Sequence, residues 1–379
     1  MGRCWKPRRQ LRIVNISLWC SVQIVKATTR YETWLAKYTF IVRADLNLKH
    51  QRMAADPFSF LRATFYRWVQ TWPTICERLT EAPRVLAVGD LHLENFGTWR
   101  DLEGRLIWGV NDFDEAFPLP YTNDLVRLAT GVVLARETNR VAMHPADASD
   151  AILAGYAESL KARGKPFVLE EHHHWLRELA LNALRDPVRF WKNIDMLRPV
   201  RQPIANSAIK ALEALMPAHD LDYRVVRRVA GIGSLGRPRL VALAEWGGAR
   251  LAREAKALLP SACVWQAGGS SARTYYSALI ERAVRVPDPF VAVRRRWIVR
   301  RLAPDCSRIE LTMLPKMRDE AKLLYAMGWE TANVHLATKG VRKRILLDLR
   351  RRPRRWLDQA ARQMADAIHR DWQAWRKTR

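Results

Sequence analysis

Oxygen-bearing side chains are concentrated between Val88 and Asp124, in a chain that otherwise carries a large excess of positive charge. Carboxylate and amide oxygens are the ligands that a hard, octahedral cation such as Mg²⁺ prefers in proteins. Such clustering needs a chemical reason, and metal binding is the first candidate. The side chains concerned are Asp90, His92, Glu94, Asn95, Asp112, Asp114, Glu115 and Asp124.

The residues after Asn95 predict a β-hairpin that returns the chain to the same place. Phe96 to Trp99 is typical of an extended strand and residues 105–110 of a buried strand, with a turn between them. The hairpin brings Asp112 back beside Asn95, and oxygen ligands on adjacent strand ends suit Mg²⁺. The sequence therefore predicts a magnesium site formed by Asn95 and Asp112, with Asp114 as an alternative ligand.

The spacing of Asp90 and Asn95 is that of the catalytic Asp and the magnesium-binding Asn of protein kinases. Residues 89–95 resemble the GD-x-H-x-x-N loop of the aminoglycoside phosphotransferase and choline kinase group. Residues 112–114 resemble the metal-binding segment of that group. The resemblance implies that Asp90 accepts the proton of an acceptor hydroxyl.

The chain also resembles a bacterial family with kinase-like motifs, domain-of-unknown-function family two-two-five-two, over roughly Tyr31 to the C-terminus. This resemblance implies a kinase-like fold that uses ATP and Mg²⁺, and it assigns no acceptor. We expect His92 to support the catalytic loop and Asp124 to cap a helix running to Arg136. Two other interpretations stay open. GD-x-H also opens a metallophosphoesterase signature, although the chain has no GNH segment, and the acids could form a surface loop.

Residues 231–236 form a G-x-G-x-x-G motif, which indicates little until its flanks are considered. A dinucleotide-binding fingerprint runs from a strand into a helix, whereas here β-like runs at 223–230 and 239–246 flank the glycines. A strand, a glycine loop and a strand in succession is the kinase arrangement, in which backbone N–H groups cover the phosphates of ATP. The nucleotide-binding residues predicted from this loop are Gly231, Gly233, Ser234 and Gly236.

The phosphate-pairing lysine of a kinase is expected on the next strand, within residues 250–256. Relatives in the resembled family have Lys-Glu-Ala where this chain has Arg253 followed by Glu and Ala, which puts Arg253 in the lysine's place. Lys256 supplies the cation instead after a small shift of register, and the sequence does not decide between the two. Glu281, on a helix predicted over 271–284, is either the ion-pair partner of this cation or a solvent-facing side chain.

The order of these motifs differs from that of an ordinary kinase, in which the glycine loop precedes the catalytic loop. We therefore expect an α+β, protein-kinase-like two-lobed fold that is circularly permuted, with a mainly helical large lobe and a small antiparallel-sheet lobe. Chain termini that lie close together make such a permutation tolerable. The expected divisions are a basic, unstructured extension over 1–30, a catalytic-loop and helical lobe over 31–222, and a glycine-loop lobe over 223–303. Residues 304–379 are expected to return to the large lobe. This last part begins beyond a hinge and includes a basic linker at 342–355.

Composition limits the partners and the compartment. Lys and Arg number 64 against 38 acids, a net charge of +26, and they are spread along the chain, which favours a diffuse solvated surface over a nucleic-acid face. Arg62 and Arg67 could contact a phosphate, but such arginines are more often at a solvated edge, and they are left out of the predicted site. Five cysteines without a CxxC pair indicate neither a zinc site nor a disulfide framework, and the apolar run at 13–25 is too short to span a bilayer. These features favour a cytoplasmic protein.

The combined prediction is phosphoryl transfer from Mg-ATP to a hydroxyl of a small-molecule acceptor. The first alternative is a pseudokinase that binds ATP without transferring phosphate. The second is a basic nucleic-acid-binding protein, whose affinity would fall steeply with salt. The sequence does not identify the acceptor.

Overall fold

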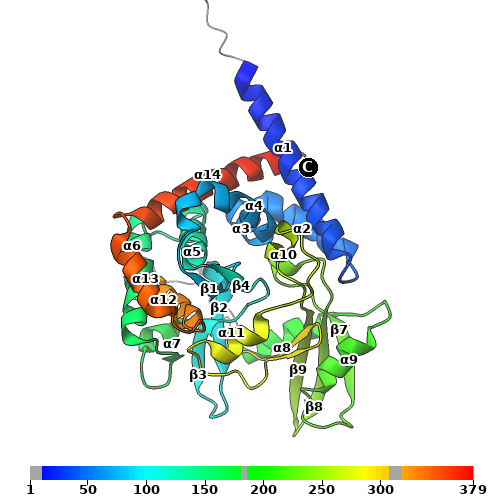
Figure 1. The fold of residues 1–379 in the computed structure, drawn as a ribbon. Coiled ribbons are helices and arrows are strands. Elements are labelled where there is room, and N and C mark those ends of the chain that lie inside the picture. The colour runs from blue at the N-terminus through cyan, green and yellow to red at the C-terminus, as the bar shows by residue number, and fades with distance from the viewer. Residues whose placement is uncertain (1–10, 181–185, 307–317, 379) are drawn as a thin grey trace, which may run out of the picture.

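The computed structural model describes residues 11–180, 186–306 and 318–378. It is a mixed α and β structure with antiparallel sheets, which confirms the predicted α+β class (Figure 1). Most of the helices gather on one side, and the largest sheet lies at the other. The helices are α1 (Leu11–Leu35), α2 (Arg43–Ala55), α3 (Pro57–Ala63), α4 (Phe65–Ile75), α5 (Tyr121–Glu137), α6 (Pro145–Ala162), α7 (His174–Ala180), α8 (Pro187–Asp195), α9 (Asn206–Glu213), α10 (Ala262–Gln266), α11 (Tyr276–Arg282), α12 (Arg318–His335), α13 (Val341–Arg351) and α14 (Trp356–Arg376).

Three sheets are formed by the described strands, and all of their pairings are antiparallel. The largest has six strands in the order β10-β11-β9-β8-β7-β6, and the others are β1-β4 and β2-β3-β5. The strands are β1 (Arg84–Ala87), β2 (Phe96–Arg100), β3 (Leu106–Val110), β4 (Phe117–Pro120), β5 (Phe167–Val168), β6 (Arg198–Pro199), β7 (Tyr223–Arg227), β8 (Arg239–Trp246), β9 (Ala249–Ala257), β10 (Ala292–Arg294) and β11 (Trp297–Leu302).

The six-stranded sheet has its own apolar cores, one on each face, because successive side chains of a strand point to opposite faces. Leu240 of β8 packs with Ala208 and other small side chains of α9, whereas Val241 of the same strand packs with Ile194 of α8. Helices α8 and α9 therefore pack on the sheet. Both helices precede residue 223, the boundary predicted from the sequence, since an amphipathic pattern alone does not indicate which surface a helix covers.

Two other expected segments differ in the structure. Residues 342–355, expected to be a linker, contain most of α13, because Val341 and Ile345 are one turn apart and both are buried. The extension expected over 1–30 is helical from residue 11 onward, and Ile24 and Thr28 of α1 are buried. Residues 1–10 lie outside the described residues.

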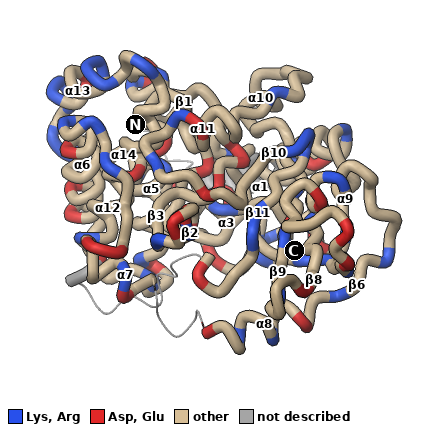
Figure 2. The backbone as a smooth tube through the Cα atoms, turned by 90° about the horizontal axis from the view of Figure 1, so that it is seen from below, with Lys and Arg blue, Asp and Glu red and all other residues tan. Residues whose placement is uncertain are grey.

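The charge distribution follows the expectation from composition. Lys and Arg are dispersed over many elements, with a dense run on α13 (Figure 2). None of the helices in the described ranges is both long enough and apolar enough to cross a membrane.

Helices α6 and α12 approach each other at two glycines that face the opposite backbone. A Cβ built on Gly328 would lie 2.0 Å from the carbonyl oxygen of Ile152, and one built on Gly155 would lie 1.9 Å from that of Tyr325. A backbone oxygen cannot move aside as a flexible side chain can, so only glycine permits this crossing.

Replacing either glycine should force the two helices apart. We expect Gly328→Ala to lower the free energy of unfolding by about 3 kcal/mol, since the crossing would be overpacked. Gly131 of α5 is a matched control, because a Cβ there would meet its nearest neighbour at an ordinary 3.7 Å. Gly131→Ala should leave stability unchanged or raise it by up to about 1 kcal/mol, through helix propensity. Denaturant unfolding of both variants checks this prediction. Equal changes in the free energy of unfolding would contradict the close contact of α6 and α12 at Gly328.

Candidate functional site

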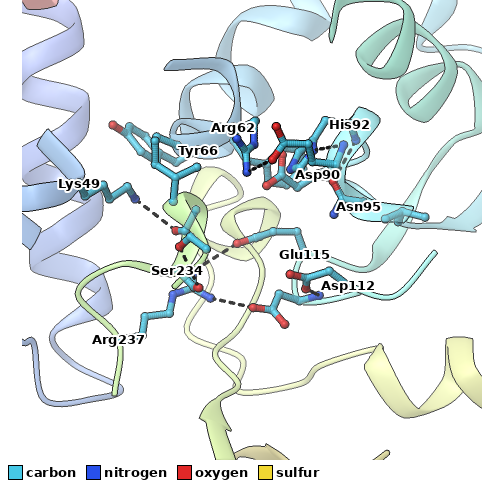
Figure 3. Close-up of a pocket in the computed structure, with 18 of the residues that line it drawn as sticks. Lys49, Arg62, Tyr66, Asp90, His92, Asn95, Asp112, Glu115, Ser234 and Arg237 are labelled. Carbon is cyan, nitrogen blue, oxygen red and sulfur yellow. Dashed lines mark hydrogen bonds and ion pairs between the residues drawn. The ribbon is translucent and has the colours of Figure 1, made fainter. Parts of the chain in front are cut away.

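A cavity of about 50 Å³ lies where the glycine loop meets the catalytic loop and the hairpin (Figure 3). It is lined by all of the site residues predicted from the sequence except Gly236 and Arg253. Segments near residues 90, 112, 232 and 256, far apart in the chain, thus meet in one place. The predicted residues in its lining are Asp90, His92, Asn95, Asp112, Asp114, Gly231, Gly233, Ser234 and Lys256.

Asp124 holds the backbone that carries the catalytic loop. Its carboxylate accepts hydrogen bonds from the backbone N–H of Val88 at 2.7 Å and of Gly89 at 3.0 Å, and it lies 3.0 Å from Nε2 of His335. The sequence analysis expected Asp124 to cap the following helix, but α5 begins at Tyr121 and Asp124 is in its first turn. A helix pattern could not reveal that this carboxylate points at a distant loop.

Asp90 leaves this backbone toward the cavity and is bound from behind by Arg127. The guanidinium donates from Nε to Oδ1 of Asp90 at 2.9 Å and also from Nη2. Burial raises the pKa of Asp90 to about 7, against the lowering effect of Arg127. A carboxyl group with a pKa near neutrality can take up a proton under ordinary conditions, as a general base must.

His92 and Asn95 form reciprocal hydrogen bonds around the short 3₁₀ turn Leu93–Asn95. The backbone N–H of Glu94 donates to Nδ1 of His92 at 3.2 Å, and that of His92 donates to Oδ1 of Asn95 at 3.1 Å. His92 therefore shapes the loop, as expected. Oδ1 of Asn95 has two lone pairs, so it can accept this bond and also face a metal ion.

The predicted hairpin is present and performs the expected positioning. Phe96 pairs with Val110 in the β2–β3 ladder, and the backbone N–H of Asn111 donates to the carbonyl oxygen of Asn95 at 2.9 Å. Asp112 therefore follows directly beside Asn95.

Asp112 and Asp114 share one cation. Nζ of Lys256 lies 3.2 Å from Oδ2 of Asp112 and also pairs with Asp114. Burial raises the pKa of Asp114 to about 6, and its Oδ1 is buried without a hydrogen-bond partner among the described residues. An unsatisfied buried carboxylate oxygen needs an explanation, and a cation bound from the cavity would supply one.

The donor set fits Mg²⁺ only in part. No group of three or more His, Cys, Asp or Glu side chains suited to a metal occurs in the part of the chain that the structure describes. Two carboxylates and one amide are nevertheless what Mg²⁺ commonly takes from a protein when phosphate oxygens and waters complete its octahedron. Asn95, Asp112 and Asp114 would hold it together with a phosphorylated ligand.

The structure distinguishes the two candidate cations on β9. Lys256 points into the cavity, whereas Arg253, three residues earlier, lies on the opposite face of the strand. Nε of Arg253 donates to the carbonyl oxygen of Leu215 at 2.9 Å, and its guanidinium lies over the ring of Phe290. Arg253 is therefore not a residue of this cavity. Glu281 is exposed on α11, which agrees with the solvent-facing alternative.

Gly236 shapes the glycine loop and does not line the cavity. Its φ of 94° requires glycine, and its carbonyl oxygen accepts the N–H of Val42 at 2.9 Å. This bond fastens the glycine loop to the segment that precedes α2.

Several charged lining residues were not assigned to the site from the sequence. Arg62, expected on a solvated surface, pairs with Glu94 at 2.6 Å. Arg237 bonds to Glu115 at 3.3 Å, and Lys49 donates to the carbonyl oxygen of Gly233 at 3.4 Å. Arg237 directly follows the glycine loop, whereas Lys49 and Arg62 lie far along the chain from any motif.

The sheet face beside Lys256 is charged. Glu254, fully buried, accepts hydrogen bonds from Arg239 at 3.0 Å, from Arg300 at 2.8 Å and from Arg228. Arg239 also donates to Oγ of Ser234 at 2.8 Å, which ties the glycine loop to this cluster. These guanidinium groups keep the pKa of Glu254 well below its usual range, although burial opposes them.

Comparison with known proteins gives a match over the part of the chain that contains the predicted catalytic loop. Residues 42–186 match the model of a family described as an uncharacterized protein conserved in bacteria (DUF2252). Over these residues the match agrees with the resemblance noted in the sequence. The DUF2252 segment contains Asp90, Asn95 and Asp112, while the glycine loop lies beyond it. Neither the curated proteins nor the solved structures contain a match to the chain.

Proposed function

We propose that this protein transfers a phosphoryl group from Mg-ATP to a hydroxyl of a small-molecule acceptor. The observation that carries the proposal is the convergence in one cavity of the glycine loop, Lys256 and the three oxygen-bearing residues Asp90, Asn95 and Asp112. Phosphoryl transfer needs little covalent chemistry from a protein, and these groups supply the positioning and charge that it does need.

Each residue has a separate role in this reaction. Asp90 orients the acceptor hydroxyl and takes its proton as the oxygen bonds to the γ-phosphorus and the bond to the ADP oxygen breaks. Asn95 and Asp112 would hold Mg²⁺, whose charge would neutralise that of the phosphates. Lys256 pairs with the phosphates, and the backbone of Gly231 and Gly233 covers them.

The sheet supports a kinase-like, circularly permuted arrangement. The glycine loop joins β7 to β8, Lys256 lies on the third strand β9, and a helix, α11, follows before the sheet resumes with β10. This is the succession that a kinase small lobe presents. This small lobe begins more than a hundred residues after Asp90. The large lobe would therefore be formed first along the chain, and the chain would return to it at α12.

The glycine loop lies against the catalytic loop in this structure. A Cβ on Gly233 would lie 3.1 Å from the carbonyl oxygen of Arg62 and 3.6 Å from Oδ2 of Asp90, so the loop rests on the catalytic loop. A volume of about 50 Å³ holds a few water molecules. Nucleotide binding therefore requires the glycine loop to lift, a motion typical of such lids.

A second candidate is a nucleotide-binding module without transfer. It is favoured by the pairing of Lys256 with both Asp112 and Asp114, which occupies the metal ligands, and by the charged surface around Glu254, where a nucleoside pocket is ordinarily apolar. Against it stands Asp90, whose raised pKa suits a base.

Calorimetry and turnover assays with Mg²⁺ and ATP distinguish these functions. We expect ATP to bind only when Mg²⁺ is present, and ADP to form when an acceptor is supplied. Binding without ADP formation across a broad acceptor library would favour the second candidate, and absence of binding would exclude both.

A further inference from the structure

Three buried cations around Asp90 come from outside the predicted kinase-like motifs. Lys49 on α2 is 3% exposed and Arg237 is 6% exposed, while the side chain of Arg62 on α3 is 12% exposed. Lysine and arginine are rarely so buried unless they are paired. The motifs themselves require only Lys256. Arg62 already pairs with Glu94 and Arg237 with Glu115, so an anion could be bound only by the donors that these pairs leave over.

The hydrogen bonds of these cations are incomplete among the described residues. Nε of Arg62 and Nε of Arg237 are buried without a partner. Nζ of Lys49 reaches the carbonyl oxygen of Gly233 only at 3.4 Å, the long end of the range for such a bond. A buried donor without an acceptor is costly, so an anion that enters the cavity would satisfy all three sites.

The positions of the cations divide the cavity into two sides. Figure 3 shows Arg62 beside Asp90 and His92, and Arg237 near Glu115 and Asp112 across the cavity. Phosphates held by Lys256, the metal ligands and the glycine loop would lie on the Arg237 side. An acceptor that presents its hydroxyl to Asp90 has to approach along the other side, where α3 contributes Arg62.

Lys49 lies on the side of the cavity from which the acceptor would approach. It reaches the cavity from α2, and its hydrogen-bond acceptor among the described residues is on the glycine loop, which must lift when nucleotide binds. Lifting Gly233 removes that acceptor and leaves a buried ammonium group facing the space above Asp90. The ring of Tyr66, 5.7 Å from Nζ, lines the same side.

We propose that the acceptor is itself an anion, whose phosphate or carboxylate group is bound by Arg62 and Lys49 while its hydroxyl faces Asp90. The inference rests on the proposed function and narrows its substrate class. An anionic acceptor would be attracted by these two side chains, whereas a cationic amino alcohol would be repelled by them. The same anion chemistry could also come from the γ-phosphate of ATP, and the experiment has to separate these two sources.

The test uses the full-length protein saturated with Mg²⁺ and a non-hydrolysable ATP analogue, with inorganic phosphate as the probe of the second anion. Calorimetric titration should show one phosphate bound per protein in the presence of the analogue. Arg62→Gln and Lys49→Gln should each weaken phosphate binding about tenfold or more and change analogue binding less than threefold. Arg52→Gln, on the exposed face of α2, is the matched control and should change neither.

Each other outcome overturns the inference in a distinguishable way. Analogue binding without phosphate binding, or phosphate binding that both variants leave unchanged, would mean that the acceptor is not held as an anion here. Competition between phosphate and the analogue would assign Arg62 and Lys49 to the nucleotide. Failure of the analogue to bind would remove the proposed function as well. Thermal unfolding shows whether each variant is folded. If one of the two variants is not folded, the other still tests the inference.

Discussion

Asp112→Asn should reduce the proposed phosphoryl transfer by about 10³-fold or more, because it would remove a charged ligand of the proposed Mg²⁺ at the point where charge develops. The effect should fall on turnover more than on stability. Asp112 is half-buried, and Lys256 retains Asp114 as an ion-pair partner after the substitution. The measurement is steady-state ADP formation at saturating ATP, with Mg²⁺ varied over a wide range.

The hairpin offers a matched control for this substitution. Glu103 lies at the exposed turn of the same hairpin, so Glu103→Gln removes one negative charge without touching the cavity. It should leave turnover within twofold of the unsubstituted protein. If Asp112→Asn were equally harmless, Asp112 would not be a metal ligand and the second candidate function would gain support.

Asp90→Asn should lower turnover by about 10²- to 10⁴-fold, the range for loss of a general base, while ATP binding persists. The amide oxygen can still accept from Arg127, and the buried guanidinium also keeps its hydrogen bond to the carbonyl oxygen of Leu61. A modest loss of stability is expected from the lost charge, and the unfolding temperature should be recorded beside turnover. Loss of ATP binding in this variant would mean that Asp90 supports the fold rather than the reaction.

The pH dependence of turnover by the unsubstituted protein tests the same assignment. Because burial raises the pKa of Asp90 to about 7, the carboxyl is protonated below that pH and can act as a base above it. We expect kcat/KM to rise about tenfold per pH unit well below pH 7 and to level off above it. A profile that is flat from pH 5.5 to 8.5, measured at saturating Mg²⁺, would contradict a proton-accepting role for Asp90.

Local sequence patterns were enough to predict much of the site. The hairpin between Asn95 and Asp112 followed from strand propensity and a turn, and the strands around the glycine loop followed from their flanking sequences. These features depend on neighbours in the chain, which is why the sequence determines them. Arg62 and Arg127 gave no such signal, since the partners that make them part of the site are 32 and 37 residues away, Glu94 for the first and Asp90 for the second.

The sequence by itself determined which side chains can do chemistry: the acids of the catalytic loop and hairpin, the glycine loop, and a cation on β9. Only the tertiary structure decided between Arg253 and Lys256, because the alternation of a strand places them on opposite faces and the register is set by pairing with β8 and β11. It also decided that Lys49 and Arg62 surround Asp90, because burial and long-range contacts depend on how α2 and α3 pack on the glycine loop.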